Sequence, residues 1–138
     1  MSTETSPQKA KWPTVICVLS VIYTLLYAAL YVRPPRPGAD MVPSLGNWII
    51  CLLFLSGSIG LGLRRRWAVS LLLIGSIFAL VMVTVSFFSI IAAMGGVPDL
   101  FVLLGILTFM FPTLAWPVFL IIWFSRSSTK RMIQEQWI

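Results

Sequence analysis

The sequence contains no histidine and only four acidic residues. These acids are Glu4, Asp40, Asp99 and Glu135, and none of them lies in the interior of an apolar stretch. General acid–base catalysis depends mostly on His and carboxylates, and most metal sites use His, Cys or carboxylates. We therefore expect no catalytic residues, no metal site and no cofactor, so the chain is not expected to be an enzyme.

Charged residues of either sign are also scarce. They make up 10% of the 138 residues, whereas hydrophobic residues make up 59%, and the mean hydropathy is +0.96. Soluble domains carry about 25% charged and about 45–50% apolar residues, so this chain has too few charges to cover a water-exposed surface. Two cysteines are too few for a disulfide scaffold, and the apolar content excludes a disordered chain. The composition predicts an integral membrane protein.

Four long apolar stretches account for this composition. They cover approximately residues 13–32, 46–63, 67–93 and 98–125. A helix needs about 20 apolar residues to cross about 30 Å of hydrocarbon, and these stretches are of that order or longer. Residues 49–55 are continuously apolar, without the alternation of a barrel strand. The sequence predicts an all-α integral membrane protein whose four transmembrane helices form one domain over residues 13–125.

Two short tails flank this domain. Residues 1–12 are polar and are expected to form a disordered cytoplasmic N-terminal tail. Residues 126–138 are expected to form a cytoplasmic tail at the membrane interface, with Ile133 and Trp137 on one side and basic residues that meet anionic lipid. A partner-binding tail is the alternative. The proline-rich residues 33–45, between the first two stretches, are expected to be extended.

The basic residues predict the orientation of the chain in the membrane. If four helices alternate in direction, the two chain ends and the turn between the second and third helices share one face. That face carries eight of the ten basic residues, namely Lys9, Lys11, Arg64, Arg65, Arg66, Arg126, Lys130 and Arg131. Short loops rich in Lys and Arg remain in the cytoplasm. Both termini are therefore expected to be cytoplasmic, with Arg64, Arg65 and Arg66 as the topology-determining residues.

The basic pI of about 10.0 is explained by this asymmetry, and no nucleic-acid partner is expected. The expected location is a bacterial inner membrane, which a multi-pass chain with a basic cytoplasmic face would fit.

Small residues recur along one face of the third stretch. A 4-3 spacing relates Ala68, Leu72, Gly75, Ala79, Met82, Ser86, Ser89 and Ala93, of which six are small. Such a face allows close helix packing at a crossing angle of about +20°. The sequence predicts a helix-packing seam centred on Gly75, Ala79, Met82, Ser86 and Ser89. The alternative is that this face lines a pore.

Two prolines interrupt the fourth stretch. Pro112 and Pro117 have no N–H, so the carbonyls of Thr108 and Thr113 lose their helical partners. In some transporters, carbonyls freed in this way coordinate ions. Because no carboxylate lies in the membrane to help bind a cation, we favour a structural kink in which neighbouring groups satisfy these carbonyls.

Aromatic residues in the first and fourth stretches have two interpretations. Tyr23, Tyr27 and Tyr31 lie on one helical face. They form either a ligand-facing stripe, or an arrangement in which Tyr31 lies in the outer aromatic belt while Tyr23 and Tyr27 bond neighbouring helices. We favour the second interpretation. Trp116 lies near mid-depth, where its indole N–H needs a hydrogen-bond partner.

Two functions are compatible with these features. The favoured one is helix–helix association, as an accessory or assembly subunit or as a homo-oligomer, with the lipid bilayer and another membrane protein as partners. The alternative is a small oligomeric channel or transporter lined by Ser, Thr and the freed carbonyls. The first stretch lacks the glutamate that small proton-coupled drug exporters need.

Overall fold

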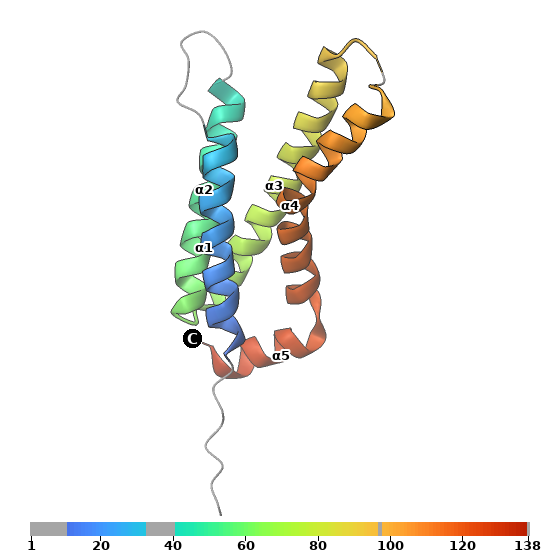
Figure 1. Cartoon of the computed structure of the whole chain (residues 1–138). Coiled ribbons are helices and arrows are strands. Elements are labelled where there is room, and N and C mark those ends of the chain that lie inside the picture. The colour runs from blue at the N-terminus through green and yellow to red at the C-terminus, as the bar shows by residue number, and fades with distance from the viewer. Residues whose placement is uncertain (1–10, 33–40, 97, 138) are drawn as a thin grey trace, which may run out of the picture.

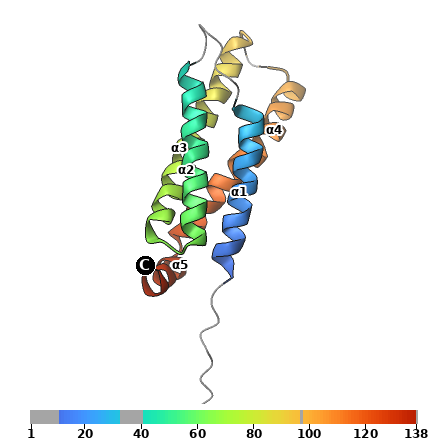
Figure 2. The same ribbon diagram turned by 90° about the vertical axis from the view of Figure 1, so that its left-hand side faces the viewer.

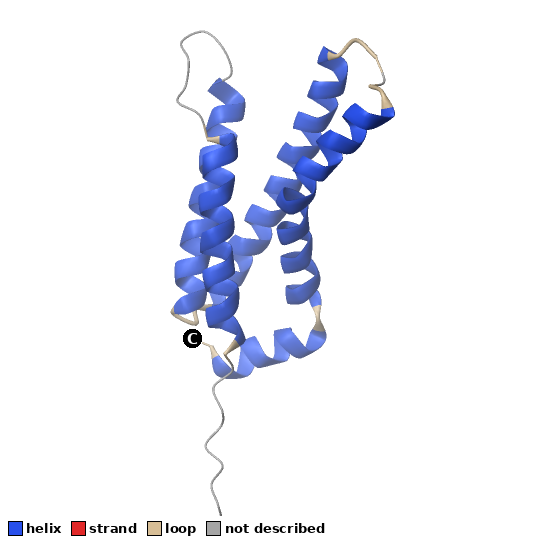
Figure 3. Cartoon of the chain, in the orientation of Figure 1, coloured by secondary structure: helices blue, strands red, loops and turns tan. Residues whose placement is uncertain are grey.

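We obtained a computed structural model of the chain, which describes residues 11–32, 41–96 and 98–137. The described residues form five α-helices and no strand (Figures 1 and 3). The helices are α1 (Trp12–Tyr31), α2 (Met41–Gly62), α3 (Arg66–Ala93), α4 (Leu100–Ser125) and α5 (Ser127–Gln136). The first four are long and apolar enough to cross a membrane, which suggests a multi-pass membrane protein. The prediction of four long apolar helices is confirmed.

Two helix boundaries differ from the predicted ones by two residues or more. Helix α2 begins at Met41, so the expected extended conformation is wrong for residues 41–45. Pro43 fits there because the first N–H groups of a helix have no intrahelical acceptor, and the missing N–H therefore costs little. Helix α4 begins at Leu100 instead of residue 98, after Asp99 with extended backbone. The expectations for residues 1–10 and 33–40 concern parts of the chain outside the described residues.

Helix α2 packs against α1 on one side and α3 on the other, whereas α4 packs mainly on α3 (Figures 1 and 2). Glycines on α2 bring its backbone close to α3. A Cβ atom at Gly57 would lie 2.8 Å from Leu72 Cγ, and one at Gly60 would lie 2.8 Å from Ala68 Cβ. The resulting core is centred on Phe54 of α2 and Leu72 of α3, both of which are fully buried.

Arg64 is the residue at which the chain turns between α2 and α3. Its backbone adopts the left-handed conformation, with φ of 54°. The Arg64 N–H donates to the Leu61 carbonyl at 3.0 Å, and the Arg65 N–H donates to the Gly60 carbonyl at 2.9 Å. Glycine is the usual residue at this position of a Schellman motif. The turn therefore carries a basic side chain at a backbone cost of about 1–2 kcal/mol.

Helix α5 crosses the base of the bundle, roughly perpendicular to the long helices (Figure 1). Ile133 and Trp137 are buried against the bundle, and Trp12 of α1 stacks on Trp137 with ring centroids 5.7 Å apart. The apolar side of α5 therefore faces the other helices of the chain. Both ends of the described chain lie at the end of the bundle that holds the turn with Arg64.

Candidate functional site

Three tyrosines of α1 form a polar network with α2 and α4 in the interior of the bundle. Tyr23 Oη donates to the Thr113 carbonyl at 2.9 Å, and Tyr27 Oη donates to Asn47 Oδ1 at 2.8 Å. Asn47 Nδ2 in turn donates to the Tyr31 carbonyl at 3.2 Å. The stripe therefore bonds neighbouring helices, as the favoured interpretation of its spacing requires.

The Thr113 carbonyl is the one that Pro117 leaves without a helical partner. An unpaired carbonyl in an apolar environment is costly, and the Tyr23 hydroxyl supplies the missing donor. The Thr113 hydroxyl also lies 3.4 Å from Tyr31 Oη. Pro117 thus leaves a free carbonyl on α4 to which a tyrosine of α1 donates. This hydrogen bond joins two helices that otherwise have few contacts.

The other freed carbonyl belongs to Thr108, near the tilted half of α4. Figure 1 shows that α4 bends: its first half leans in the same direction as α3, and its second half stands upright. The Thr108 hydroxyl donates to the Leu104 carbonyl at 2.8 Å. Thr108, Pro112 and Thr113 line one cavity between α1 and α4, and the Thr113 carbonyl there accepts its hydrogen bond from Tyr23.

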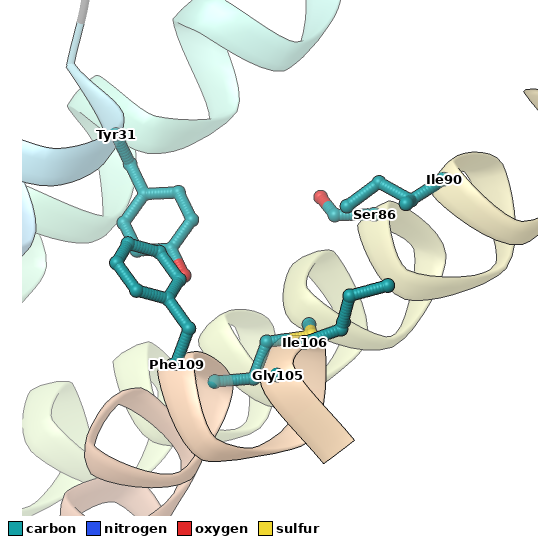
Figure 4. A pocket seen from close by; sticks show the side chains of 7 residues that line it. Tyr31, Ser86, Ile90, Gly105, Ile106 and Phe109 are labelled. Atoms are coloured by element: carbon teal, nitrogen blue, oxygen red, sulfur yellow. The ribbon is translucent and has the colours of Figure 1, made fainter. Parts of the chain in front are cut away.

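Two adjoining cavities lie between α1, α3 and the first half of α4. The smaller, of about 300 Å³, is lined by Tyr31, Ser86, Ile90, Gly105, Ile106, Phe109 and Met110 (Figure 4). The larger, of about 550 Å³, is lined by Leu30, Gly105, Thr108, Phe109, Pro112 and Thr113. Because both share Gly105 and Phe109, we treat them together as the α4 cleft. The lining of the cleft is mostly apolar.

The predicted seam on α3 divides into two parts. Gly75 and Ala79 are buried; a Cβ atom at Gly75 would lie 3.2 Å from Leu53 Cβ, and Met82 packs against Gly46. Ser86, by contrast, is half-buried in the α4 cleft, and Ser89 is exposed. The first part of the seam therefore packs on α2 within the chain, while the described residues leave the second part uncovered.

The three arginines near the base have different roles in the structure. Arg64 closes the turn and Arg65 is exposed. The Arg66 guanidinium donates through Nε to the Trp137 carbonyl at 2.8 Å and through Nη2 to the Gln134 carbonyl at 2.7 Å. These carbonyls belong to the end of α5, where the helix dipole is negative and a cation is favourable. Arg66 therefore fastens α5 to the bundle.

Some buried donors have no hydrogen-bond partner within the described part of the chain. They are Ser20 Oγ, Trp116 Nε1 and Trp123 Nε1. The predicted need of Trp116 for a partner is thus not met there, although its ring stacks on Phe119 with centroids 5.3 Å apart. No group of His, Cys, Asp or Glu within residues 11–32, 41–96 and 98–137 is arranged to hold a metal ion.

Sequence reasoning missed Asn47 and the attachment of α5. Asn47 is the only asparagine of the chain and stands at the start of an apolar stretch. A polar amide at such a position commonly bonds a neighbouring helix, so the signal was present. The bonds of Arg66 to α5 had no such signal, because the tripeptide at 64–66 predicts topology equally well with any orientation of its side chains.

We compared the chain with known protein families, curated proteins and solved structures. No family model, curated protein or solved structure matches the chain.

Proposed function

We propose that this chain is a multi-pass membrane protein with four transmembrane helices and both termini in the cytoplasm. It acts by associating with another membrane protein or with copies of itself, as an accessory or assembly subunit, without catalytic chemistry. Support for the orientation comes from the eight basic residues expected on one face. The proposed location, the inner membrane of a bacterium, is based on the same charge asymmetry.

The observation that carries this proposal is an uncovered face of small residues on the second part of α3. Ser89, Ala92 and Ala93 are all exposed and are spaced so that they share one face. Association of helices in lipid depends on close backbone packing and interhelical hydrogen bonds, both of which small residues allow. A partner helix would find this surface available, whereas the first part of the seam is occupied by α2.

Bulky substitutions on this face test the proposal. Ser89→Leu and Ala93→Leu should shift the protein purified in mild detergent from an oligomer or complex to a smaller species, measured by light scattering after size exclusion. Thr84→Leu is the matched control, because Thr84 is exposed on the same helix but on another face. A wild-type protein that stays monomeric and forms no cross-links in membranes would contradict the proposal.

A small oligomeric channel or transporter is the second candidate. Thr108, with the carbonyl freed by Pro112, lines the α4 cleft together with Ser86. The bond from Tyr23 to the Thr113 carbonyl weighs against it, because that acceptor is already used. Flux measurements on purified protein in liposomes separate the two candidates: robust, selective conductance would replace association as the proposed function.

A further inference from the structure

The α4 cleft has the volume of a ligand site, and the space next to Gly105 is open. Its two parts, of about 300 Å³ and 550 Å³, fall within the range of about 300–1,000 Å³ common for ligand pockets. Gly105 belongs to both parts, and a Cβ atom there would meet nothing within 4 Å. Side chains from α1, α3 and α4 surround this space without filling it (Figure 4).

The polar side chains of the cleft are bonded within the protein. Ser86 Oγ donates to the Met82 carbonyl at 2.8 Å, and Thr108 Oγ1 donates to the Leu104 carbonyl at 2.8 Å. Tyr31 Oη lies 3.4 Å from Thr113 Oγ1. A polar solute or an ion would find little to replace its hydration shell, because these hydroxyls already have partners and the carbonyl that Pro112 frees at Thr108 is a single acceptor. The remaining lining favours an apolar ligand.

The surroundings of the cleft indicate which apolar ligand reaches it. It lies along α1, α3 and α4, each of which is long and apolar enough to span a membrane. An empty apolar space forfeits dispersion contacts on its walls, and water there would lack the two to four polar partners it needs. In a bilayer, the nearest material that can fill a narrow apolar cleft is a lipid chain.

We infer that the α4 cleft binds an acyl chain of a membrane phospholipid between α1, α3 and the first half of α4. The acyl chain packs against Phe109, Ile106 and Ile90, which line the smaller part of the cleft. The inference rests on the proposed membrane location and does not depend on the proposed association with a partner.

Photochemical labelling of the full chain in lipid vesicles tests this site. The probe is phosphatidylcholine with a diazirine in the middle of one acyl chain, and the adducts are mapped by mass spectrometry. In the wild-type protein, we expect adducts concentrated on residues 105–110 and on the segment around Ser86 and Ile90. Gly105→Leu should lower this labelling about tenfold, which corresponds to a loss of about 1.4 kcal/mol in binding.

Gly96→Leu is the matched control. A Cβ atom at Gly96 also meets nothing within 4 Å, but this residue lies in the turn after α3 and outside the cleft. It should leave the labelling unchanged. If Gly105→Leu does not fold, Gly105→Ala and the wild-type map decide the question.

Three outcomes would overturn the site. Labelling spread evenly over exposed residues such as Phe101 and Phe111, and insensitive to Gly105→Leu, would indicate bulk lipid only. Protein–protein cross-links from a photoreactive amino acid placed at position 109, together with an absence of lipid adducts at residues 105–110, would assign the cleft to a second copy of the chain. Adducts nowhere on the chain, with protein extracted from membranes by alkaline carbonate, would instead refute the membrane location itself.

Discussion

At the scale of single residues, hydrogen bonds to backbone carbonyls determine how the helices of this bundle meet. Pro117 frees the Thr113 carbonyl, and the Tyr23 hydroxyl donates a hydrogen bond to it at 2.9 Å. The sequence predicted both parts of this contact separately, as a tyrosine stripe and as a proline-freed carbonyl. It did not predict that they meet, because helix periodicity gives the face of a residue and not the neighbour which that face contacts.

Tyr23→Phe should destabilise the protein. The substitution keeps the buried ring but leaves the Thr113 carbonyl without a donor. Interhelical hydrogen bonds in membrane proteins contribute about 0.6–1.7 kcal/mol, and we expect a loss of that size in the free energy of unfolding. The measurement is denaturant-induced unfolding in detergent micelles.

A double-mutant cycle with Pro117→Ala isolates this bond. Alanine restores an N–H that can donate to the Thr113 carbonyl within α4, so Tyr23→Phe should cost less in that background. If Tyr23→Phe lowers the free energy of unfolding equally in both backgrounds, the hydrogen bond from Tyr23 to the Thr113 carbonyl does not contribute to stability.

Arg64 permits a second prediction at this scale. Its φ of 54° is strained for a residue with a Cβ atom. Arg64→Gly and Arg64→Ala both remove the side chain, so their difference reports the backbone alone. We expect the glycine variant to be more stable to unfolding than the alanine variant by about 1 kcal/mol. The same pair at Arg65, where φ is −91°, should show no such preference for glycine.

At the scale of helices, the seam on α3 shows what periodicity alone predicts and what it leaves open. The 4-3 spacing placed Gly75, Ala79 and Met82 on one face, and that face does pack closely, on α2. Ser86 and Ser89 continue the same spacing but are not covered by α2. The spacing does not indicate over what length α2 and α3 stay in contact before they diverge. The division of the seam into two parts could therefore be seen only in the structure.

Gly75→Leu should destabilise the folded chain even where no oligomer is present. A Cβ atom at Gly75 already lies 3.2 Å from Leu53 Cβ, and the rest of a leucine side chain would push α2 and α3 apart. Overpacking of this kind costs about 1–3 kcal/mol in the free energy of unfolding. Val81→Leu is the control because Val81 is 53% exposed. Unfolding curves that coincide for Gly75→Leu and Val81→Leu would refute the close packing of α2 and α3.

The attachment of α5 is an element-scale property that depends on Arg66. Arg66→Gln removes the charge-assisted bonds to the Trp137 and Gln134 carbonyls. Loss of a favourable cation at a helix C-terminus is worth about 0.3–1 kcal/mol, so the amides of α5 should exchange with solvent a few times faster. Hydrogen exchange by mass spectrometry measures this. Arg65→Gln removes an equal charge from the same turn, and equally fast exchange in that variant would refute a specific role for Arg66.

At the scale of the whole molecule, the distribution of apolar residues along the sequence was enough to predict four long apolar helices and their approximate positions. The fifth helix was harder to predict from the sequence. Helix α5 is short and amphipathic, and it gains its stability from the packing of Ile133 and Trp137 against the other helices. The open side between α1 and the first half of α4 was not predictable either, because Pro112 and Pro117 predict a kink in α4 but not the direction in which the first half of the helix leans. Both features determine which apolar surfaces of the described helices stay exposed.

The most direct test of the account is the topology of the chain in a membrane. In a background in which Cys17→Ser and Cys51→Ala remove the two native thiols, single cysteines are introduced as Arg36→Cys and Ser128→Cys. They are labelled with a membrane-impermeant maleimide in intact cells and again after permeabilisation. We expect that the cysteine at position 36 reacts in intact cells and that the one at position 128 reacts only after permeabilisation. Labelling at position 128 in intact cells would contradict a cytoplasmic C-terminus and with it the proposed arrangement of four membrane-spanning helices.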